Sequence, residues 1–277
     1  MSELVKRTLS GAVYVGCVVG CIVWNQWAVA GLILLIGLLA VDEFHRRVES
    51  HPIQRFYAAV GVIILWLMTV FHTYPLVLVF AAMYLPFMFM SLLDEIWNHS
   101  GKPLQVWGNM LISQVMIAFP LLTMQFMYML DMHMLLALFI LIWVNDTGAY
   151  CVGTLTAKRA QGNHKMAPHI SPNKSWEGLF GGVAFAMIGA VILHYCGWFT
   201  PFGGHLWLAL LFGALTSLFG TMGDLLESLF KRSLGIKDSG TFLPGHGGVL
   251  DRFDSILLAA PVLTSYAWLC YFLAPLL

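Results

Sequence analysis

The chain has 277 residues, of which 59% are apolar and 10% are charged, and its 14 basic and 14 acidic side chains give a formal net charge of zero. Soluble globular domains carry about 25% charged residues, so this composition excludes an ordinary water-soluble protein. The sequence therefore predicts an all-α integral membrane protein.

About nine apolar windows are long enough to cross a hydrocarbon core of roughly 30 Å as helices. In chain order they lie near residues 9–24, 26–44, 56–73, 75–92, 104–122, 124–144, 178–198, 205–226 and 254–275. We expect a single polytopic membrane domain over residues 1–277, with scaffold helices in 1–144 and the candidate functional region in 145–277, where most polar residues lie.

The first window follows Lys6 and Arg7 and has the basic-then-apolar form of a signal peptide, with a small-residue run at 28–30 that imitates a cleavage site. A second apolar run follows at once. This favours a retained helical hairpin over a cleaved leader.

The basic residues indicate the orientation of the chain. If the N-terminus is cytoplasmic and nine spans alternate, all 14 Lys and Arg residues fall on the cytoplasmic side, as the positive-inside rule requires. The sequence predicts a protein of the bacterial inner membrane, with a cytoplasmic active site and an external C-terminus. The basic face would lie against anionic headgroups and could attract phosphorylated ligands.

Two long cytoplasmic loops are expected, from Asn145 to Glu177 and from Glu227 to Asp254, because both stretches are rich in Gly, Pro, Ser, Lys and His. Between them, Gly178 and Gly182 have the four-residue spacing typical of close helix packing in membranes.

Asp224, Asp251 and Asp254 are the candidate metal ligands. A charge inside a transmembrane helix costs about 2.5–3.5 kcal/mol at its centre, so Asp224, near the end of the eighth window, is a functional candidate. Asp251 and Asp254 are three residues apart and would share a helix face. Helix capping could explain one of these two, but it does not explain Asp224 at a C-terminal end. Oxygen ligands of this kind suit Mg²⁺.

Basic side chains and glycines surround these acids in the second loop: Lys231, Arg232, Lys237, His246 and Arg252, with Gly245, Gly247 and Gly248. A cation beside such groups is typical of phosphoryl or nucleotidyl transfer. Lys231 and Arg232 alone could simply anchor topology. The first loop adds Asn145, Asp146, Ser171, Asn173, Lys174 and Glu177, but the chain contains no Walker pattern.

The run "SLFKRSLGIKDSGTFLPGHGGVLDRFD" at 228–254 closely resembles the signature of the phosphatidate cytidylyltransferases, also called CDP-diacylglycerol synthases. The segments "NDTGAY" and "SPNKSWEG" are similar to other shared segments of that family, with Asn173 and Ser175 as mild variants. The resemblance implies that CTP and phosphatidate react to give CDP-diacylglycerol and pyrophosphate.

The resemblance also implies roles for individual residues. Asp224 and Asp251 would hold Mg²⁺ with Asp254 as a third contributor, and a monovalent cation such as K⁺ could lie beside it. The expected catalytic residues are Lys231, Arg232, Lys237, Asp238, His246 and Arg252. The expected substrate-binding residues are Asn145, Asp146, Ser171, Lys174, Ser228, Gly247 and Gly248.

Two other functions are compatible with these residues. An ion-coupled transporter also places carboxylates in membranes, although the chain shows none of the inverted repeats frequent in transporters. A CTP-dependent lipid kinase would leave CDP rather than pyrophosphate, and the intact signature argues against it. The expected partners are CTP, phosphatidate and the bilayer, without nucleic acid, and the sequence is compatible with a monomer or a homodimer.

Overall fold

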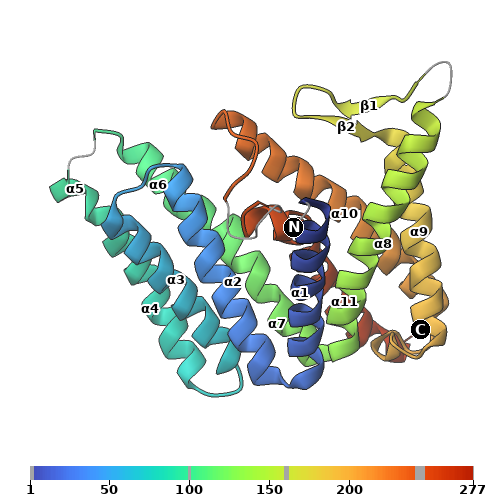
Figure 1. Cartoon of the computed structure of the whole chain (residues 1–277). Coiled ribbons are helices and arrows are strands. Elements are labelled where there is room, and N and C mark those ends of the chain that lie inside the picture. Colours follow the sequence, from blue (N-terminus) through green and yellow to red (C-terminus); the bar gives the residue numbers. More distant parts are fainter. Residues whose placement is uncertain (1–2, 99–100, 159–161, 241–246, 277) are drawn as a thin grey trace. The chain divides into compact units, whose positions relative to one another are not determined.

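The computed structural model describes residues 3–98, 101–158, 162–240 and 247–276. The described residues are almost entirely helical, as predicted, with a single β-hairpin (Figure 1). They group into two compact units. The first comprises Met1–Phe126 with Asp238–Phe253, and the second comprises Met127–Lys237 with Asp254–Leu277.

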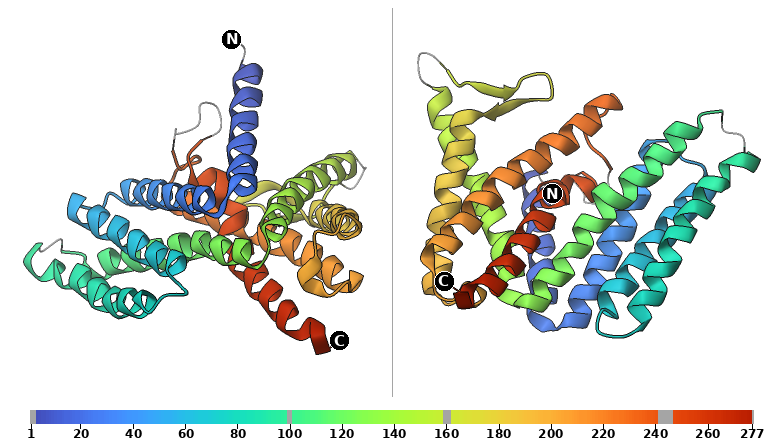
Figure 2. Two further views of the ribbon diagram at one scale, coloured as in Figure 1. Left: turned by 90° about the horizontal axis from the view of Figure 1, so that it is seen from below. Right: turned by 180° about the vertical axis from the view of Figure 1, so that it is seen from behind.

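The first unit is an assembly of helices. Its elements in chain order are α1 (Glu3–Trp24), α2 (Gln26–Arg47), α3 (Pro52–Val70), α4 (Leu76–Leu93), α5 (Glu95–Asn98), α6 (Pro103–Ile112), the π-helical turn η1 (Ser113–Ala118), most of α7 (Phe119–Leu130) and the first residues of α11 (Leu250–Leu273). Helices α2, α3 and α4 lie side by side in sequence order (Figures 1 and 2).

A buried glutamine connects two helices of this unit. Gln114, in the π-helical turn, donates from Nε2 to the carbonyl oxygen of Ala58 on α3 at 3.0 Å. Gly61 makes room for it, because a Cβ at that position would lie 2.5 Å from the Gln114 side-chain oxygen. The buried amide therefore has a partner, as buried polar groups require.

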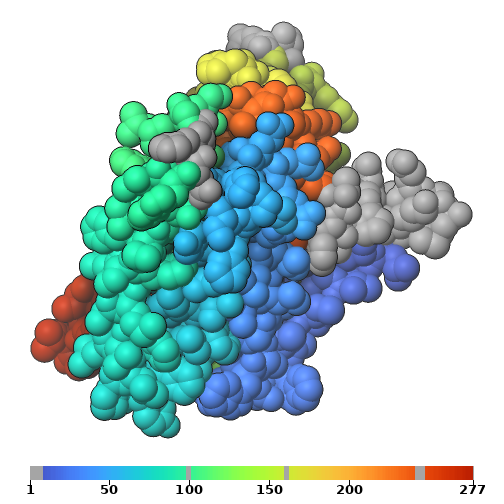
Figure 3. Space-filling view, turned by 90° about the vertical axis from the view of Figure 1, so that its left-hand side faces the viewer, coloured from blue at the N-terminus to red at the C-terminus, as the bar shows by residue number. Residues whose placement is uncertain are grey.

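The surface of α4 is apolar and exposed, as expected of a helix that faces lipid. Leu78 is 71% exposed, and Leu85 and Phe89 are also exposed. Figure 3 shows this face, with α4 among the teal residues in front. A soluble protein would bury such a surface.

Within the described residues, eight helices are long and apolar enough to cross a membrane, and Leu9–Trp24 is a shorter apolar helix. The shorter helix coincides with the first of the predicted windows. The chain is therefore an all-α integral membrane protein.

The second unit holds α8 (Met132–Ala157), a hairpin of β1 (Lys165–Ala167) and β2 (Ser171–Ser175), α9 (Trp176–Tyr195), the short turn η2 (Thr200–Phe202), α10 (Leu206–Ser233), the remainder of α11 and η3 (Ala274–Leu276). Helices α8 and α9 pack along each other, and α10 packs against both (Figures 1 and 2). The strands pair antiparallel.

One predicted helix boundary was wrong. The windows 104–122 and 124–144 imply a helix boundary near residue 123, whereas in the structure one helix ends and the next begins at Asp131. Asp131 has extended backbone and caps α8, since its carboxylate accepts the His133 N–H at 2.8 Å and the Thr200 hydroxyl at 2.9 Å. An N-cap of this kind decides where a helix starts.

The two predicted loops are therefore shorter than expected. Asn145 and Asp146 lie inside α8 rather than in a loop, because that helix continues to Ala157. Helix α10 continues past Glu227 to Ser233. The stretch between α8 and α9 contains the hairpin, which the sequence did not predict.

Close packing of α8 and α9 depends on glycines. A Cβ at Gly182 would overlap the Asn145 side-chain oxygen, and a Cβ at Gly181 would lie 2.5 Å from Val152. The spacing of small residues in this helix thus has the packing role expected from the sequence.

We expect Gly182→Ala to destabilise the protein by about 1–3 kcal/mol, because overpacking forces neighbouring side chains out of place. Thermal unfolding in detergent measures this loss. Gly20→Ala is the matched control, since its Cβ would meet nothing within 4 Å and alanine favours a helix. Equal unfolding temperatures for the two variants would contradict the packing role.

Candidate functional site

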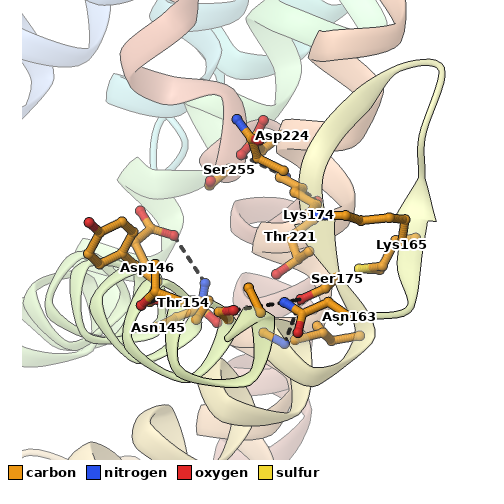
Figure 4. A pocket seen from close by; sticks show the side chains of 18 residues that line it. Asn145, Asp146, Thr154, Asn163, Lys165, Lys174, Ser175, Thr221, Asp224 and Ser255 are labelled. Carbon is orange, nitrogen blue, oxygen red and sulfur yellow. Dashed lines mark hydrogen bonds and ion pairs between the residues drawn. The ribbon is translucent and has the colours of Figure 1, made fainter. Parts of the chain in front are cut away.

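The second unit contains a hollow of about 610 Å³ between α8, the hairpin, the N-terminal part of α9 and the C-terminal part of α10. Figure 4 shows it from close by. Its polar lining residues are Asn145, Asp146, Tyr150, Thr154, Asn163, Lys165, Asn173, Lys174, Ser175, Thr221, Asp224 and Ser255. The hollow brings together four residues that the sequence singled out as site residues, namely Asn145, Asp146, Lys174 and Asp224.

An ion pair between Lys174 and Asp224 crosses this hollow. The Lys174 ammonium lies 2.6 Å from Asp224 Oδ2 and donates to the Thr221 carbonyl oxygen at 3.2 Å. The side chains are 20% and 35% exposed, so both remain open to a ligand. In Figure 4, Lys174 extends from the hairpin toward Asp224 on α10.

Ser228 supports the acid of this pair from one helical turn further along α10. Its hydroxyl donates to Asp224 Oδ1 at 3.3 Å, as the i to i+4 spacing predicts. Ser228 is thus a neighbour of the candidate metal ligand.

Asn145 is held rigidly beside the hollow. It is 2% exposed, its side-chain oxygen accepts the Ser217 hydroxyl, and its Nδ2 donates to Asp146 Oδ1 at 3.1 Å. The amide thereby orients the Asp146 carboxylate, which lines the hollow. Asn145 is therefore better placed to position Asp146 than to bind a ligand itself.

The acids of the second unit have the donor chemistry that Mg²⁺ requires. Asp254 on α11 lies within electrostatic range of Asp224, Glu227 and Lys174, and Asp146 lies within range of Asp224. Carboxylate oxygens are hard ligands of the kind that Mg²⁺ binds. Among the residues that the structure describes, no three His, Cys, Asp or Glu side chains already converge as a metal site. Asp224 and Asp254 fit Mg²⁺ by donor type.

Lys231 and Arg232, both predicted to be catalytic, have protein partners outside the hollow. Lys231 pairs with Glu227 one turn earlier, and their side chains are only 12% and 2% exposed. Arg232 donates to the carbonyl oxygens of Ile170 and Ile236 at 3.2 and 3.1 Å. These contacts connect the end of α10 to the hairpin and to the following turn.

Other predicted residues lie apart from the hollow. Ser171 is in β2 and does not line it, and Lys237 and Asp238 are exposed after α10. His246 lies outside the described residues. Their expected roles stay predictions.

Asp251, Gly247, Gly248 and Arg252 belong to the first unit. Asp251 Oδ2 accepts the N–H and hydroxyl of Ser239, both at 2.9 Å, and the Gly248 N–H at 2.7 Å. The carboxylate therefore organises the loop that precedes α11 rather than capping the helix itself. Arg252 is half-buried in the first turn of that helix.

Sequence reasoning missed Asn163 and Lys165 in the hairpin region and Glu43 on α2. Asn163 donates to the Gly153 carbonyl oxygen at 2.7 Å and to Ser175 Oγ at 3.3 Å. Ser175 caps α9 through the Gly178 N–H, and a serine just before a helix could have revealed that cap. Lys165 adds a second positive charge to the hollow, without a sequence signal of its own.

The similarity of the chain to known proteins agrees with the resemblance seen in its sequence. The chain matches the cytidylyltransferase family over residues 5–270. It is 46% identical over 132 residues to the phosphatidate cytidylyltransferase of Staphylococcus haemolyticus, covering 48% of each chain. It is 45% identical over 143 residues to that of Staphylococcus saprophyticus, covering 50% of this chain and 52% of the relative. The matched segment thus spans about half the length of these curated relatives. Because the family match extends over nearly all of the sequence, the chain belongs to the cytidylyltransferase family.

Proposed function

We propose that this protein is a phosphatidate cytidylyltransferase, which transfers CMP from CTP to phosphatidate and releases pyrophosphate. Membership of the cytidylyltransferase family and the names of the relatives support this activity. The observation that carries it is the Lys174–Asp224 pair in a hollow of a membrane protein. A hollow of this kind offers both charges that a phosphate and its counter-cation need.

In the proposed reaction, an oxygen of the phosphatidate phosphate attacks the α-phosphorus of CTP. A new P–O bond forms there, and the bond from the α-phosphorus to the bridging oxygen breaks, so its electron pair leaves with pyrophosphate. Phosphatidate is already ionised at neutral pH and needs no general base to lose a proton. Catalysis is then mainly positioning and charge neutralisation.

Residues of the hollow can supply these effects. Lys174 and Lys165 would neutralise charge on the triphosphate or the lipid phosphate, while Asn145 keeps the Asp146 carboxylate oriented. Asp224 and Asp254 of the second unit would hold Mg²⁺, and a monovalent cation such as K⁺ is proposed beside them. The expected role of Asp251 as a Mg²⁺ ligand, with Asp254 as the third contributor, stays a prediction. When bound, Mg²⁺ would offset the negative charge of the phosphates.

We further propose that the N-terminus and the hollow face the cytoplasm of a bacterial inner membrane and that the C-terminus lies outside. The distribution of the 14 Lys and Arg residues supports this orientation. CTP would arrive from water, whereas phosphatidate would diffuse in the bilayer with its acyl chains still in hydrocarbon.

The position of the label in the products tests this function. Purified protein in micelles with phosphatidate would receive CTP labelled on the α- or the γ-phosphate. We expect α-label in the lipid and γ-label in aqueous pyrophosphate. The γ-label in the lipid would instead identify a kinase, and substrate flux into liposomes without either product would identify a transporter.

A further inference from the structure

A second polar cluster lies in the first unit, where α2 meets the segment that leads into α11. Its central residue is Glu43, in a helix that the sequence suggested was only scaffold. Glu43 and the neighbouring Arg47 are four residues apart and so lie on one face of α2. Together with Ser239, Gly240 and Val249 they line a hollow of about 440 Å³.

Glu43 caps α11 from outside that helix. Its two carboxylate oxygens accept the backbone N–H groups of Val249 at 2.9 Å and Leu250 at 3.2 Å. These are the free donors at a helix start, where the helix dipole also favours a negative charge. The α2 carboxylate therefore fixes the position of the first turn of α11.

Glu43 also holds Ser239, which in turn contacts Asp251. Ser239 is fully buried, and its hydroxyl lies within hydrogen-bond distance of Glu43 Oε1 and, at 2.9 Å, of Asp251 Oδ2. The Ser239 N–H donates to the same Asp251 oxygen, and its carbonyl oxygen accepts from Arg47. Every polar group of Ser239 is thus used to connect α2 to Asp251.

Two glycines are needed for the Glu43 carboxylate to reach this place. A Cβ at Gly240 would lie 2.5 Å from Glu43 Oε2, and a Cβ at Gly248 would overlap the same carboxylate. Gly248 was expected to bind substrate. The structure gives a different reason for its lack of a side chain, which is the close approach of Glu43.

We propose that Glu43 is a positioning residue for the reaction, which holds the Asp251 carboxylate in its orientation through Ser239 and the start of α11. This inference rests on the proposed function, because Asp251 is an expected Mg²⁺ ligand there. Replacing a group that orients a metal ligand commonly lowers metal affinity or activity.

The test compares Glu43→Gln with Asp42→Asn. Both variants exchange a carboxylate for an amide on the same turn of α2, but the hydrogen bonds of Asp42 run to Arg46 and Arg55. Hydrogen–deuterium exchange is measured on the intact protein, over peptides that contain Ser239 and residues 248–250. We expect faster exchange there in Glu43→Gln only, and unchanged exchange would overturn the proposal.

The second readout is the reaction itself. For Glu43→Gln we expect kcat to fall roughly 10–100-fold and half-activation to need more Mg²⁺. The double variant with Ser239→Ala should lose no more than the more damaged single variant, because both residues act through one connection. If the fold-losses in kcat of the two single variants multiplied in the double variant, the positioning role would be contradicted. A normal kcat and a normal Mg²⁺ dependence in Glu43→Gln, despite faster hydrogen exchange, would contradict it as well.

Failure of the proposed function would look different. In that case wild-type protein would transfer no CMP, while the exchange comparison would still decide whether Glu43 holds the Ser239–Asp251 connection.

Discussion

Asp224→Asn is expected to lower kcat for CMP transfer roughly 100–1,000-fold, the range seen when one preorganised electrostatic group is removed. The amide keeps the shape of the side chain but cannot provide the negative charge that Lys174 contacts at 2.6 Å. It also removes an expected Mg²⁺ ligand. Initial rates with saturating CTP and phosphatidate, normalised to folded protein, measure the effect.

Asp131→Ala is the matched control for this variant. It removes another carboxylate of the second unit, but one that caps α8. Losing a cap should cost about 1 kcal/mol of stability and leave kcat per folded protein close to wild type. If Asp224→Asn were as active as this control, Asp224 would have no part in the reaction.

Lys174→Met should lower kcat/KM for CTP roughly 100-fold, because methionine keeps most of the length of the side chain and removes its charge from the hollow. Lys158→Met is the control, since Lys158 is exposed at the end of α8 and does not line the hollow. Steady-state kinetics at several CTP concentrations compare the two variants.

The double variant Lys174→Met/Asp224→Asn separates catalysis from structure. If the ion pair only stabilises the fold, removing both charges avoids an unpaired charge and should restore activity. If each residue acts on a substrate or cation, the double variant stays inactive. We expect the inactive result, with an unfolding temperature closer to wild type than that of either single variant.

The sequence predicted the membrane class and most helices, because apolar runs long enough to cross lipid can be recognised from hydropathy alone. It misplaced the boundary between α7 and α8. The hydrogen bond by which Asp131 caps α8 sets this boundary within a continuous apolar stretch, and hydropathy does not reveal it. The sequence also placed Asn145 in a loop. That residue is tolerated in the middle of α8 because Ser217 and Asp146 satisfy its amide.

The candidate site was predicted in part. Lys174 was chosen from a polar loop segment and Asp224 as a charge in an apolar window, but their pairing between the hairpin and α10 needed the fold. Glu43 was not predicted, because its contact with Ser239 joins residues that are 196 positions apart in the sequence. Neither hydrophobic periodicity nor a sequence motif indicates such a contact. Lys231 was expected from the sequence to be catalytic, and the structure pairs it with Glu227.

The central claim is that this membrane protein joins CMP to phosphatidate, and product stoichiometry tests it most directly. Purified wild-type protein would be given CTP, phosphatidate and Mg²⁺, and CDP-diacylglycerol and pyrophosphate would be quantified in the same reaction. We predict equal amounts of the two products, with both abolished by chelation of Mg²⁺. Accumulation of CDP with a phosphorylated lipid, or no turnover by protein shown to be folded, would contradict the claim.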